Sequence, residues 1–454
     1  MDALIIVFAS GLISLFAAFS KKPILVLSSA LGGLLLGIVS IIYQITGGQS
    51  FVKLGYDGLE FTQASLYYSL TILVFAFLLI GIGYSRFKES TEHIGEYIGL
   101  LLFSATGAVI MTAFTDMFMF FLGLEILSIP IYVMAGSNKH NALSNEASLK
   151  YFLMGSFATG VLLFGVAWIY GATGSFKVSE IAQAIFQMNI DNTMLFIGIL
   201  FILAAFLFKV GAAPFHFWSP DVYDGAPHVV TGFMASVVKI AAFSAFLKLF
   251  HEAFAMAHDF WVPALSGLMI LTLFVGNLSA IRQTKLKRLL AYSSITHVGY
   301  TLLVLISGSM TSVFDMWFYM TGYGFSVIAL IAIGISVNDE EDKIEALKGL
   351  GKRNPLLAIA GVIAVLSLAG IPLTAGFFGK YLVLADAWKE HSTLVIIALV
   401  NSAISIYYYL KVFGAIVSKS ETEQAPIKLS LLTTLIIVIT IIGMIGLPFI
   451  IPFL

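Results

Sequence analysis

Lysines inside long apolar stretches are the residues best placed to do chemistry in this sequence. Six of them lie in such stretches: Lys150, Lys209, Lys239, Lys248, Lys380 and Lys411. A charged side chain at the centre of a bilayer costs at least ~3 kcal/mol, so it normally faces the protein interior or a water-filled cavity. Lys248 and Lys411 lie near the ends of their stretches, where a long side chain can reach the interface. We therefore predict functional roles for the other four lysines.

Two further ionisable residues accompany these lysines. Glu125 is the only carboxylate deep within an apolar run. Because an unpaired buried charge is costly, Glu125 is expected to pair with a lysine. His297 lies between hydroxyl-bearing neighbours in its run, and histidine titrates nearest to neutral pH, which suits a proton relay. The alternatives are a static salt bridge for Glu125 and a helix–helix hydrogen bond for His297.

The elements that hold these residues are predicted to be transmembrane helices. Of the 454 residues, 59% are hydrophobic and only 11% are charged, which rules out a water-soluble fold. Fourteen apolar runs are long enough to cross a bilayer: 4–19, 24–45, 65–84, 97–114, 117–135, 147–170, 194–213, 229–250, 260–281, 289–307, 312–337, 356–381, 393–413 and 429–454. Strands of a membrane barrel would be ~10 residues long, about half the length of these runs. The expected fold is an all-α polytopic membrane protein with about 14 transmembrane helices.

Basic residues in the loops predict the orientation of these helices. Fifteen Lys and Arg residues lie in loops that follow odd-numbered runs, and three lie in loops that follow even-numbered runs. By the positive-inside rule, the odd loops face the cytoplasm and both termini lie on the opposite side. Lys21 and Lys22 follow the first run instead of preceding it, so this run is expected to be a retained helix and not a signal peptide.

Two of the predicted helices are interrupted. Glycine and proline occur inside or at the edge of runs 194–213 and 356–381, with Pro214 and Pro372 158 residues apart. In a membrane, paired breaks in two halves of a chain indicate an ion pathway, because the freed backbone groups must line a cavity. We predict two inverted five-helix repeats containing broken helices 7 and 12; two ordinary proline kinks are the alternative. The expected divisions are an N-terminal three-helix segment, the two repeats and a C-terminal helix, at 1–96, 97–250, 260–413 and 414–454.

The composition also excludes several kinds of site and partner. The chain has no cysteine, so it has no disulfide and no thiolate-ligated zinc or iron–sulfur centre. Its formal net charge of -1 indicates no nucleic-acid partner. His216 and His228 lie near Asp221 and Asp224, but these residues form no convergent ligand set, so no metal site is expected. Any redox cofactor in the pathway must therefore sit on other chains.

Three motifs together resemble the antiporter-like membrane subunits of respiratory complex I and, among these, the subunit N group. They are FKVGAAPFHFWSPDVYDGAPHVVTGFMASVVK at 208–239, RQTKLKRLLAYSSITHVGY at 282–300 and GIPLTAGFFGK at 370–380. The VYDGAP element and the lysine of GFFGK favour subunit N over its L and M relatives. The resemblance covers about residues 97–413, and His228 is a departure from the pattern expected of the loop.

The resemblance implies a fourteen-helix subunit that translocates protons while other subunits pass electrons from NADH to quinone. By motif, five residues match the charged positions of the fifth, sixth, seventh, eighth and twelfth helices: Glu125, Lys150, Lys209, Lys239 and Lys380. An ion pair at 4 Å is worth ~4 kcal/mol at an effective dielectric of ~20. Breaking a Glu125–Lys209 pair would therefore favour proton release from Lys209 toward Lys239, and onward to Lys380.

The resemblance also implies where the chain works and with what. The expected location is the inner (plasma) membrane of a bacterium. The expected partners are an M-type neighbour, small K-type and J-type subunits and, indirectly, the peripheral redox arm. NADH, FMN, iron–sulfur clusters and quinone are expected on those other subunits, with no cofactor on this chain.

Two other kinds of function are compatible with the residues. A subunit of a multi-subunit cation/proton antiporter, or of a related ferredoxin- or hydrogenase-linked complex, would carry the same lysines and broken helices. A purely structural membrane scaffold would need neither a mid-membrane glutamate nor buried lysines.

Overall fold

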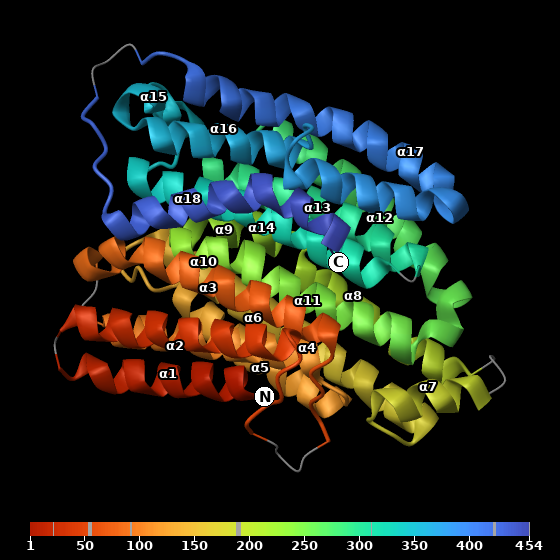
Figure 1. Ribbon diagram of the computed structural model, residues 1–454. Helices are drawn as coiled ribbons and strands as arrows, with labels where there is room; N and C mark the ends of the chain where they lie inside the picture. Colours follow the sequence, from red (N-terminus) through yellow and green to blue (C-terminus); the bar gives the residue numbers. More distant parts are fainter. Residues whose placement is uncertain are drawn as a thin grey trace.

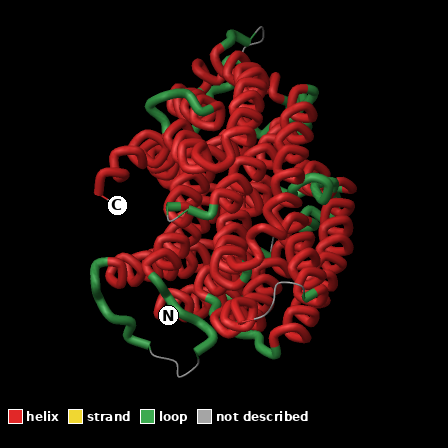
Figure 2. The backbone as a smooth tube through the Cα atoms, turned by 90° about the vertical axis from the view of Figure 1, so that its right-hand side faces the viewer, coloured by secondary structure: helices red, strands yellow, loops and turns green. Residues whose placement is uncertain are grey.

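The computed structural model is a bundle of helices that run roughly parallel or antiparallel to one another. It describes residues 1–20, 22–52, 57–187 except 91–92, 192–309, 311–420 and 424–453. Figure 2 views the bundle from one end, so that most helices are seen end-on. Within the described ranges the chain forms helices and a few isolated bridges, with no named strand.

The first half of the chain forms the helices that carry Glu125, Lys150, Lys209 and Lys239. They are α1 (Asp2–Ala18), α2 (Pro23–Ile45), α3 (Gln63–Ser90), α4 (Ile94–Ala113), α5 (Met117–Ala135), α6 (Ala142–Thr173), α7 (Val178–Gln187), α8 (Thr193–Val210), α9 (Trp218–Gly225), α10 (His228–Phe233) and α11 (Lys239–Lys248). Two π-helical segments, Met234–Val238 and Leu249–Ala253, flank α11. Side chains of Asp116, Asn141 and Asn192 accept hydrogen bonds from backbone N–H groups and so cap α5, α6 and α8.

The second half forms the helices that carry His297 and Lys380. They are α12 (His258–Ile281), α13 (Leu286–Ser307), α14 (Ser312–Val337), α15 (Leu350–Arg353), α16 (Pro355–Ala369), α17 (Ala375–Val417) and α18 (Leu431–Gly446). Short 3-10 segments lie at Ala255–Ala257, Ile344–Leu347 and Leu447–Phe453. Helix α17 is kinked at His391, whose backbone is non-helical with φ -127° and ψ 40°.

Each of the fourteen predicted runs falls on a helix of this bundle. Twelve described helices are long and apolar enough to cross a membrane, and α1 and α16 are shorter apolar helices. Helix α17 holds the last part of run 356–381 and all of run 393–413, on either side of its kink. The predicted fold class, an all-α polytopic membrane protein, is confirmed.

Both expected helix breaks are present, and each begins at a glycine. Gly211 (φ +76°) ends α8 and Gly370 (φ +80°) ends α16, both in the left-handed conformation that glycine adopts without steric cost. Pro214 and Pro372 lie in the non-helical segments that follow. The chain resumes as α9 and α17, so each break separates two helical segments.

The centre of the bundle consists of α10, α11, α13 and α14. Nearly all of their residues are buried, whereas α2, α6 and α17 bury fewer than half of theirs. Lys239 and His297 therefore lie at the middle of the protein.

Both chain termini lie at the same end of the bundle, since α1 starts and α18 finishes toward the right in Figure 1. Of the basic residues that predicted the orientation, Lys21 and Lys53 lie outside the described residues, and the side chains of Arg86 and Lys88 are likewise not described.

Candidate functional site

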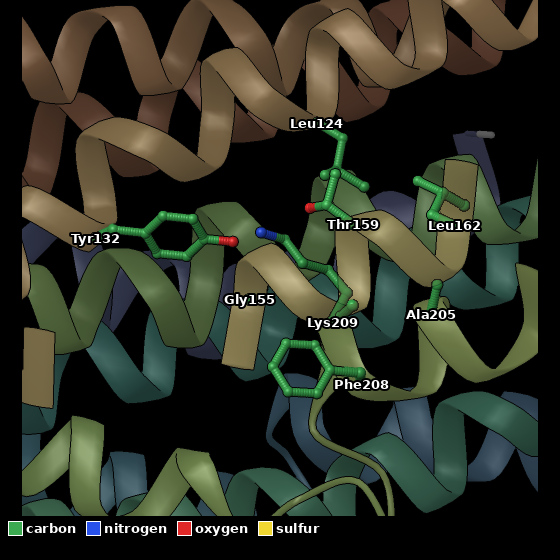
Figure 3. Close-up of a pocket in the computed structure, with 9 residues that line it drawn as sticks. Leu124, Tyr132, Gly155, Thr159, Leu162, Ala205, Phe208 and Lys209 are labelled. Carbon is green, nitrogen blue, oxygen red and sulfur yellow. The ribbon is translucent and has the colours of Figure 1, made fainter. Parts of the chain in front are cut away.

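Lys209 lies at the end of α8, directly before the first helix break. Its side chain is buried, with 6% of the residue exposed. The ammonium Nζ donates a hydrogen bond of 2.5 Å to Ser128 Oγ on α5. Ser128 in turn donates to the backbone carbonyl of Leu124. The ammonium also lies 5.9 Å from the centre of the Tyr132 ring, and Figure 3 shows the Tyr132 hydroxyl pointing toward it.

Glu125 lies one helical turn before Ser128 on α5, and its carboxylate is partly buried. Oε1 accepts a hydrogen bond of 2.8 Å from Thr159 Oγ1 on α6. Among the described side chains no Glu125–Lys209 contact within 4.0 Å occurs, so the expected pair is not a direct ion pair. The two charges are nevertheless close enough to interact electrostatically.

A small cavity lies beside Lys209, lined mainly by residues of α5, α6 and α8 (Figure 3). It leaves about 20 Å³ for the centre of a water molecule, and its polar lining comes from Lys209, Tyr132 and Thr159. A cavity of this size with several polar partners is large enough for one bound water. Gly155 lets the Tyr132 side chain approach α6 closely, because a Cβ at that position would lie 2.3 Å from the Tyr132 hydroxyl.

Lys239 is the first residue of α11 and follows the π-helical segment Met234–Val238. With 4% of the residue exposed, its ammonium donates to the carbonyl oxygen of Ser294 at 2.9 Å and to Ser294 Oγ at 2.8 Å. No carboxylate pairs with it among the described side chains. A π-helical segment is rare and often marks a functional position, and nothing in the sequence pattern predicted it.

His297 lies on α13, one turn after Ser294, and is also buried. Its Nδ1 is 2.6 Å from the Tyr319 hydroxyl on α14, and its Nε2 is 3.0 Å from the Tyr409 hydroxyl on α17. Lys239 and Lys380 both lie within electrostatic range of the ring. The histidine therefore lies near both lysines.

Lys380 lies on the first turns of α17, after the second helix break, and is buried at 5% exposure. Its ammonium donates to the carbonyl oxygen of Ala369, the last residue of α16, at 3.2 Å and to Ser402 Oγ at 3.3 Å. It also lies 5.1 Å from the centre of the Tyr300 ring. The side chain packs against the break itself, since a Cβ at Gly370 would lie 2.9 Å from Lys380 Cδ.

Lys150 has different surroundings from the other three candidate lysines. It is partly exposed and forms ion pairs with Glu146 at 2.6 Å and with Asp221 at 2.8 Å. Burial alone would raise the pKa of the Asp221 carboxyl, but hydrogen bonds from Lys150 and Arg288 hold it below its usual range. Lys150 thus belongs to a network of surface charges.

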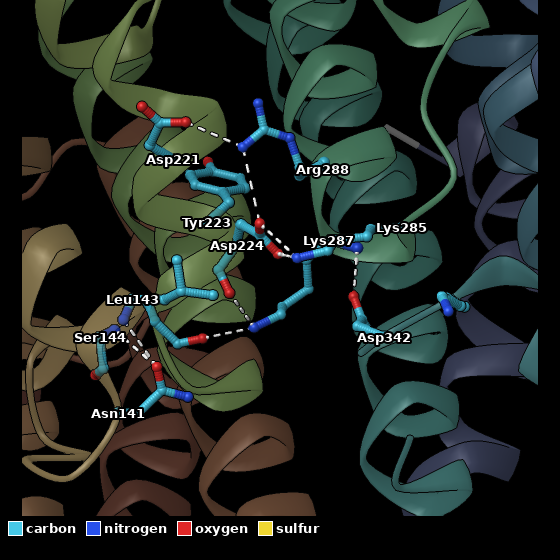
Figure 4. A network of polar contacts seen from close by, with 12 residues as sticks. Asn141, Leu143, Ser144, Asp221, Tyr223, Asp224, Lys285, Lys287, Arg288 and Asp342 are labelled. Carbon is cyan, nitrogen blue, oxygen red and sulfur yellow. Dashed lines mark hydrogen bonds and ion pairs between the residues drawn. The ribbon is translucent and has the colours of Figure 1, made fainter. Parts of the chain in front are cut away.

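Figure 4 shows the part of this network that joins the start of α13 to α9 and to Asp342, in the loop after α14. Arg288 contacts Asp221 at 3.0 Å, and Lys285 contacts Asp224 at 3.0 Å. His228, whose role the sequence left open, lies 3.0 Å from Asp342. His216 does not join it, and its Nδ1 is buried without a partner among the described residues. No group of three or more metal-ligating side chains occurs among the residues that the structure describes.

Lys248 and Lys411 have the peripheral positions expected of them. Lys411 is exposed and donates to the carbonyl oxygen of Gln283 at 2.7 Å. Lys248 is partly exposed and lies 5.3 Å from the centre of the Phe114 ring. Neither of these described contacts joins them to Lys209, Lys239 or Lys380.

The sequence pattern did not indicate the hydroxyl groups that hold Glu125, the buried lysines and the histidine. These are Ser128, Thr159, Ser294, Tyr319, Ser402 and Tyr409. A signal existed for two of them: Ser128 follows Glu125 by three residues and Ser294 precedes His297 by three, which places each pair on one helix face. The others come from separate helices, where no local spacing indicates them.

Comparisons with known proteins agree on one kind of relative. A family model described as "NADH:quinone oxidoreductase/Mrp antiporter, TM" matches residues 115–405. The chain is 41% identical to NADH-quinone oxidoreductase subunit N of Trichlorobacter lovleyi over 88% of its length and 85% of the relative's. It is 38% identical to the same-named protein of Cytophaga hutchinsonii, over 93% of this chain and 92% of that one.

Solved structures with the same fold come from complex I and from two other membrane complexes. A chain of respiratory complex I from Thermus thermophilus with bound aureothin superposes with a TM-score of 0.81 at 32% identity, covering 98% of both chains. A chain of the membrane-bound sulfane sulfur reductase, an archaeal respiratory complex, superposes with a TM-score of 0.84 at 26% identity, covering 100% of this chain and 96% of that one. At 21% identity, a chain of the Mrp complex from Dietzia shares the fold, with a TM-score of 0.80 over 92% of this chain and 79% of that one.

Proposed function

Because the chain belongs to the NADH:quinone oxidoreductase/Mrp antiporter family and is a complex I subunit of the subunit N type, we propose that it moves protons through a row of buried side chains. The row consists of Lys209, Lys239, His297 and Lys380, and Glu125 tunes its first member. Lys150, which is paired with carboxylates, would act at the rim of the row.

One observation carries this proposal. Three buried ammonium groups are held by hydroxyl and carbonyl oxygens, with no carboxylate within 4 Å of any of them among the described side chains. Such charges are costly inside a membrane protein. They are normally found where the protein transports ions or protons. An ammonium that is not fixed by an ion pair can give up its proton and regain it, which a structural salt bridge cannot do as readily.

Glu125 supports a coupling role because it is near Lys209 without touching it. The carboxylate is held by Thr159 and the ammonium by Ser128, and the two hydroxyls come from different helices. A movement of α5 against α6 would change the distance between the charges. At an effective dielectric of ~20, an increase from ~4 to ~8 Å removes about 2 kcal/mol of attraction, which alters how readily Lys209 releases its proton.

The arrangement of the two helix breaks supports an inverted repeat. Gly211 and Gly370 are 159 residues apart and end helices in the same conformation. We infer that 97–250 and 260–413 are the two repeats, since five helices per repeat would make the second enter from the opposite face. The remaining parts, 1–96 and 414–454, would then be additions at the two ends of the chain.

The sidedness of the chain is also part of the proposal. The loops after odd-numbered helices hold most of the basic residues, so they would face the cytoplasm of a bacterium and both termini would face away from it. A cysteine in place of exposed Lys139 should react with an impermeant thiol reagent only when the cytoplasmic side is accessible. A cysteine in place of exposed Lys389 should show the opposite, and reversed labelling of the two would overturn the orientation. The chain has no native cysteine to confuse the result.

The chain works as one subunit of a membrane assembly. We propose that M-type, K-type and J-type subunits are its neighbours, and that NADH, FMN, iron–sulfur clusters and quinone are bound by other chains. This chain lacks cysteine to ligate a cluster.

Replacing Lys209 by alanine tests the proposed function. The variant complex, purified with all its subunits and placed in lipid vesicles, should assemble but translocate protons about a hundredfold more slowly, as expected when one proton-transfer group is lost. Lys411→Ala is the matched control, because it removes an exposed lysine from the same chain and should leave proton transport unchanged. Normal proton transport by Lys209→Ala would favour a structural scaffold, and transport that required Na⁺ would favour cation/proton exchange.

A further inference from the structure

His297 is held by two tyrosines from two different helices. Tyr319 on α14 lies 2.6 Å from Nδ1, and Tyr409 on α17 lies 3.0 Å from Nε2. The Tyr409 hydroxyl is also 2.5 Å from Ser293 Oγ. Each of the three ring-bearing residues is at least 96% buried. Together they form a continuous hydrogen-bonded chain, Ser293–Tyr409–His297–Tyr319, which we call the tyrosine–histidine chain.

The tyrosine–histidine chain lies close to two of the buried lysines. Ser293 is the neighbour of Ser294, whose hydroxyl and carbonyl oxygens hold the Lys239 ammonium. At the other end, the Tyr319 ring packs against Gly379, the neighbour of Lys380, since a Cβ at Gly379 would lie 2.9 Å from Tyr319 Cδ2. The tyrosine–histidine chain therefore begins next to Ser294, which holds Lys239, and ends against Gly379, the neighbour of Lys380.

The hydrogen-bond donors and acceptors of the tyrosine–histidine chain can be satisfied in two ways. A neutral imidazole has one N–H donor and one acceptor nitrogen, and each phenol hydroxyl can both donate and accept. In the first arrangement Tyr409 donates to Nε2 while Nδ1–H donates to Tyr319. In the second, Tyr319 donates to Nδ1 and Nε2–H donates to Tyr409, which is then free to donate to Ser293. Both arrangements keep every group neutral and hydrogen-bonded.

Resting on the proposed function, we propose that Tyr319 and Tyr409 are proton-relay residues that pass protons through His297 between the Lys239 and Lys380 sites. The Tyr409 oxygen takes a proton from the Lys239 side as its own proton passes to Nε2. Nδ1 then gives its proton to the Tyr319 oxygen, and the former Tyr319 proton leaves toward the Lys380 amine. One proton has moved, both phenols are neutral again, and the imidazole has exchanged tautomers.

A buried hydroxyl next to the histidine fits a hydrated path. Tyr323 is 3% exposed, its ring centre lies 4.6 Å from that of His297, and its hydroxyl has no hydrogen-bond partner among the described residues. Buried polar atoms without a protein partner are usually satisfied by ordered water. Bridging water would complete the transfer at the two ends of the chain, where the relay groups do not touch the lysines.

The test uses Tyr319→Phe and Tyr409→Phe in the intact complex reconstituted in vesicles. Each change removes one hydroxyl and keeps the ring, so the packing around His297 is retained. We expect the rate of proton transport to fall about a hundredfold, the low end of the loss expected for a general acid–base group, and the number of protons moved per quinone reduced to fall with it. The ratio of transport rates in H₂O and D₂O should also change, which a purely structural role would not produce.

Tyr68→Phe is the matched control. Tyr68 is buried on α3, and its hydroxyl donates to the backbone carbonyl of Val313 at 2.9 Å, away from His297. Its loss should leave both the proton yield and the isotope ratio unchanged. Unchanged proton yield and isotope ratio in Tyr319→Phe and Tyr409→Phe would overturn the relay.

A third variant separates failure of this inference from failure of the proposed function. Lys239→Ala removes an ammonium of the row itself. If Lys239→Ala stops transport while both tyrosine variants behave as wild type, the row works but its relay does not pass through the tyrosines. If Lys239→Ala also transports normally, the proposed function itself is wrong.

Discussion

The two broken helices carry their lysines in opposite ways. At the first break Lys209 precedes Gly211 and is held by a serine of α5, with Glu125 one turn away on the same helix. At the second break Lys380 follows Gly370 and is held by the carbonyl oxygen of Ala369 and by Ser402. The first lysine has a carboxylate close enough to interact with it, whereas the second has none within 4 Å among the described side chains.

The difference shows two ways of accommodating an ammonium inside a membrane protein. Unpaired carbonyl groups at the end of a helix carry roughly half a negative charge, so the end of α16 can hold Lys380 without a counter-ion. That charge is fixed, because it belongs to the backbone. The charge of Glu125 instead belongs to a side chain, which can move toward or away from Lys209. Under the proposed function, the first site would therefore be suited to regulation and the second to acceptance of a proton.

Among the substitutions that test this comparison, Lys380→Arg should have the largest effect on proton transport. If the second site must accept and release a proton, arginine will fail although its charge is the same, because a guanidinium effectively never loses its proton. We expect normal assembly and proton transport at least about a hundredfold slower than wild type, with Lys380→Met equally slow. Lys411→Arg, at an exposed position, is the control. Near-normal transport by purified Lys380→Arg complex would show that a fixed charge suffices.

Glu125→Gln should have an intermediate effect that is confined to the first site. The amide keeps the shape and the hydrogen bond from Thr159 while removing the charge, so transport should fall by up to ~30-fold for a lost interaction of ~2 kcal/mol. Combined with Lys209→Met, it should cost less than the sum of the two single changes, because the partners are coupled.

The same glutamine variant combined with Lys380→Met is the matched comparison. Since Lys380 has no contact with Glu125, the two losses should add within about 0.5 kcal/mol. Proton transport rates of the single and double variants give both coupling energies. Equal coupling of Glu125 to the two lysines would remove the distinction between the sites.

Ser128→Ala and Ser402→Ala should have the smallest effects, and unequal ones. Ser128 Oγ lies 2.5 Å from the Lys209 ammonium. Ser402 Oγ lies 3.3 Å from the Lys380 ammonium, which also donates to the carbonyl oxygen of Ala369. A hydrogen bond to a charged group is worth about 1.5–3 kcal/mol, so Ser128→Ala should slow transport and lower thermal stability measurably. Ser402→Ala should do so by less than half as much. A larger effect of Ser402→Ala would reverse the ranking of the two contacts.

Much of the architecture could be predicted because it depends on properties that are local in sequence. The length of an apolar run determines whether it can span a bilayer, so the fourteen helical segments followed from the residues alone. Glycine and proline interrupt a helix wherever they occur, so both breaks were predictable. The cost of burying a charge likewise singled out Lys209, Lys239 and Lys380, and all three are buried.

Lys150 shows where local properties stop being informative. Its apolar surroundings in the sequence resemble those of the buried lysines, yet its ammonium pairs with Glu146 and Asp221 in a partly exposed position. Asp221 is 71 residues away in the chain. Only the packing of α9 against α6 brings that carboxylate to the lysine.

The sequence by itself determined which side chains are charged, how many helices hold them and where two of those helices break. The tertiary structure decided what each charge touches. Ser128 is 81 residues from Lys209, Ser294 is 55 from Lys239 and Tyr409 is 112 from His297. Hydrogen bonds act only over about 3 Å and depend on direction, so the partners of these residues follow from the packing of the helices and not from the order of residues along any one of them.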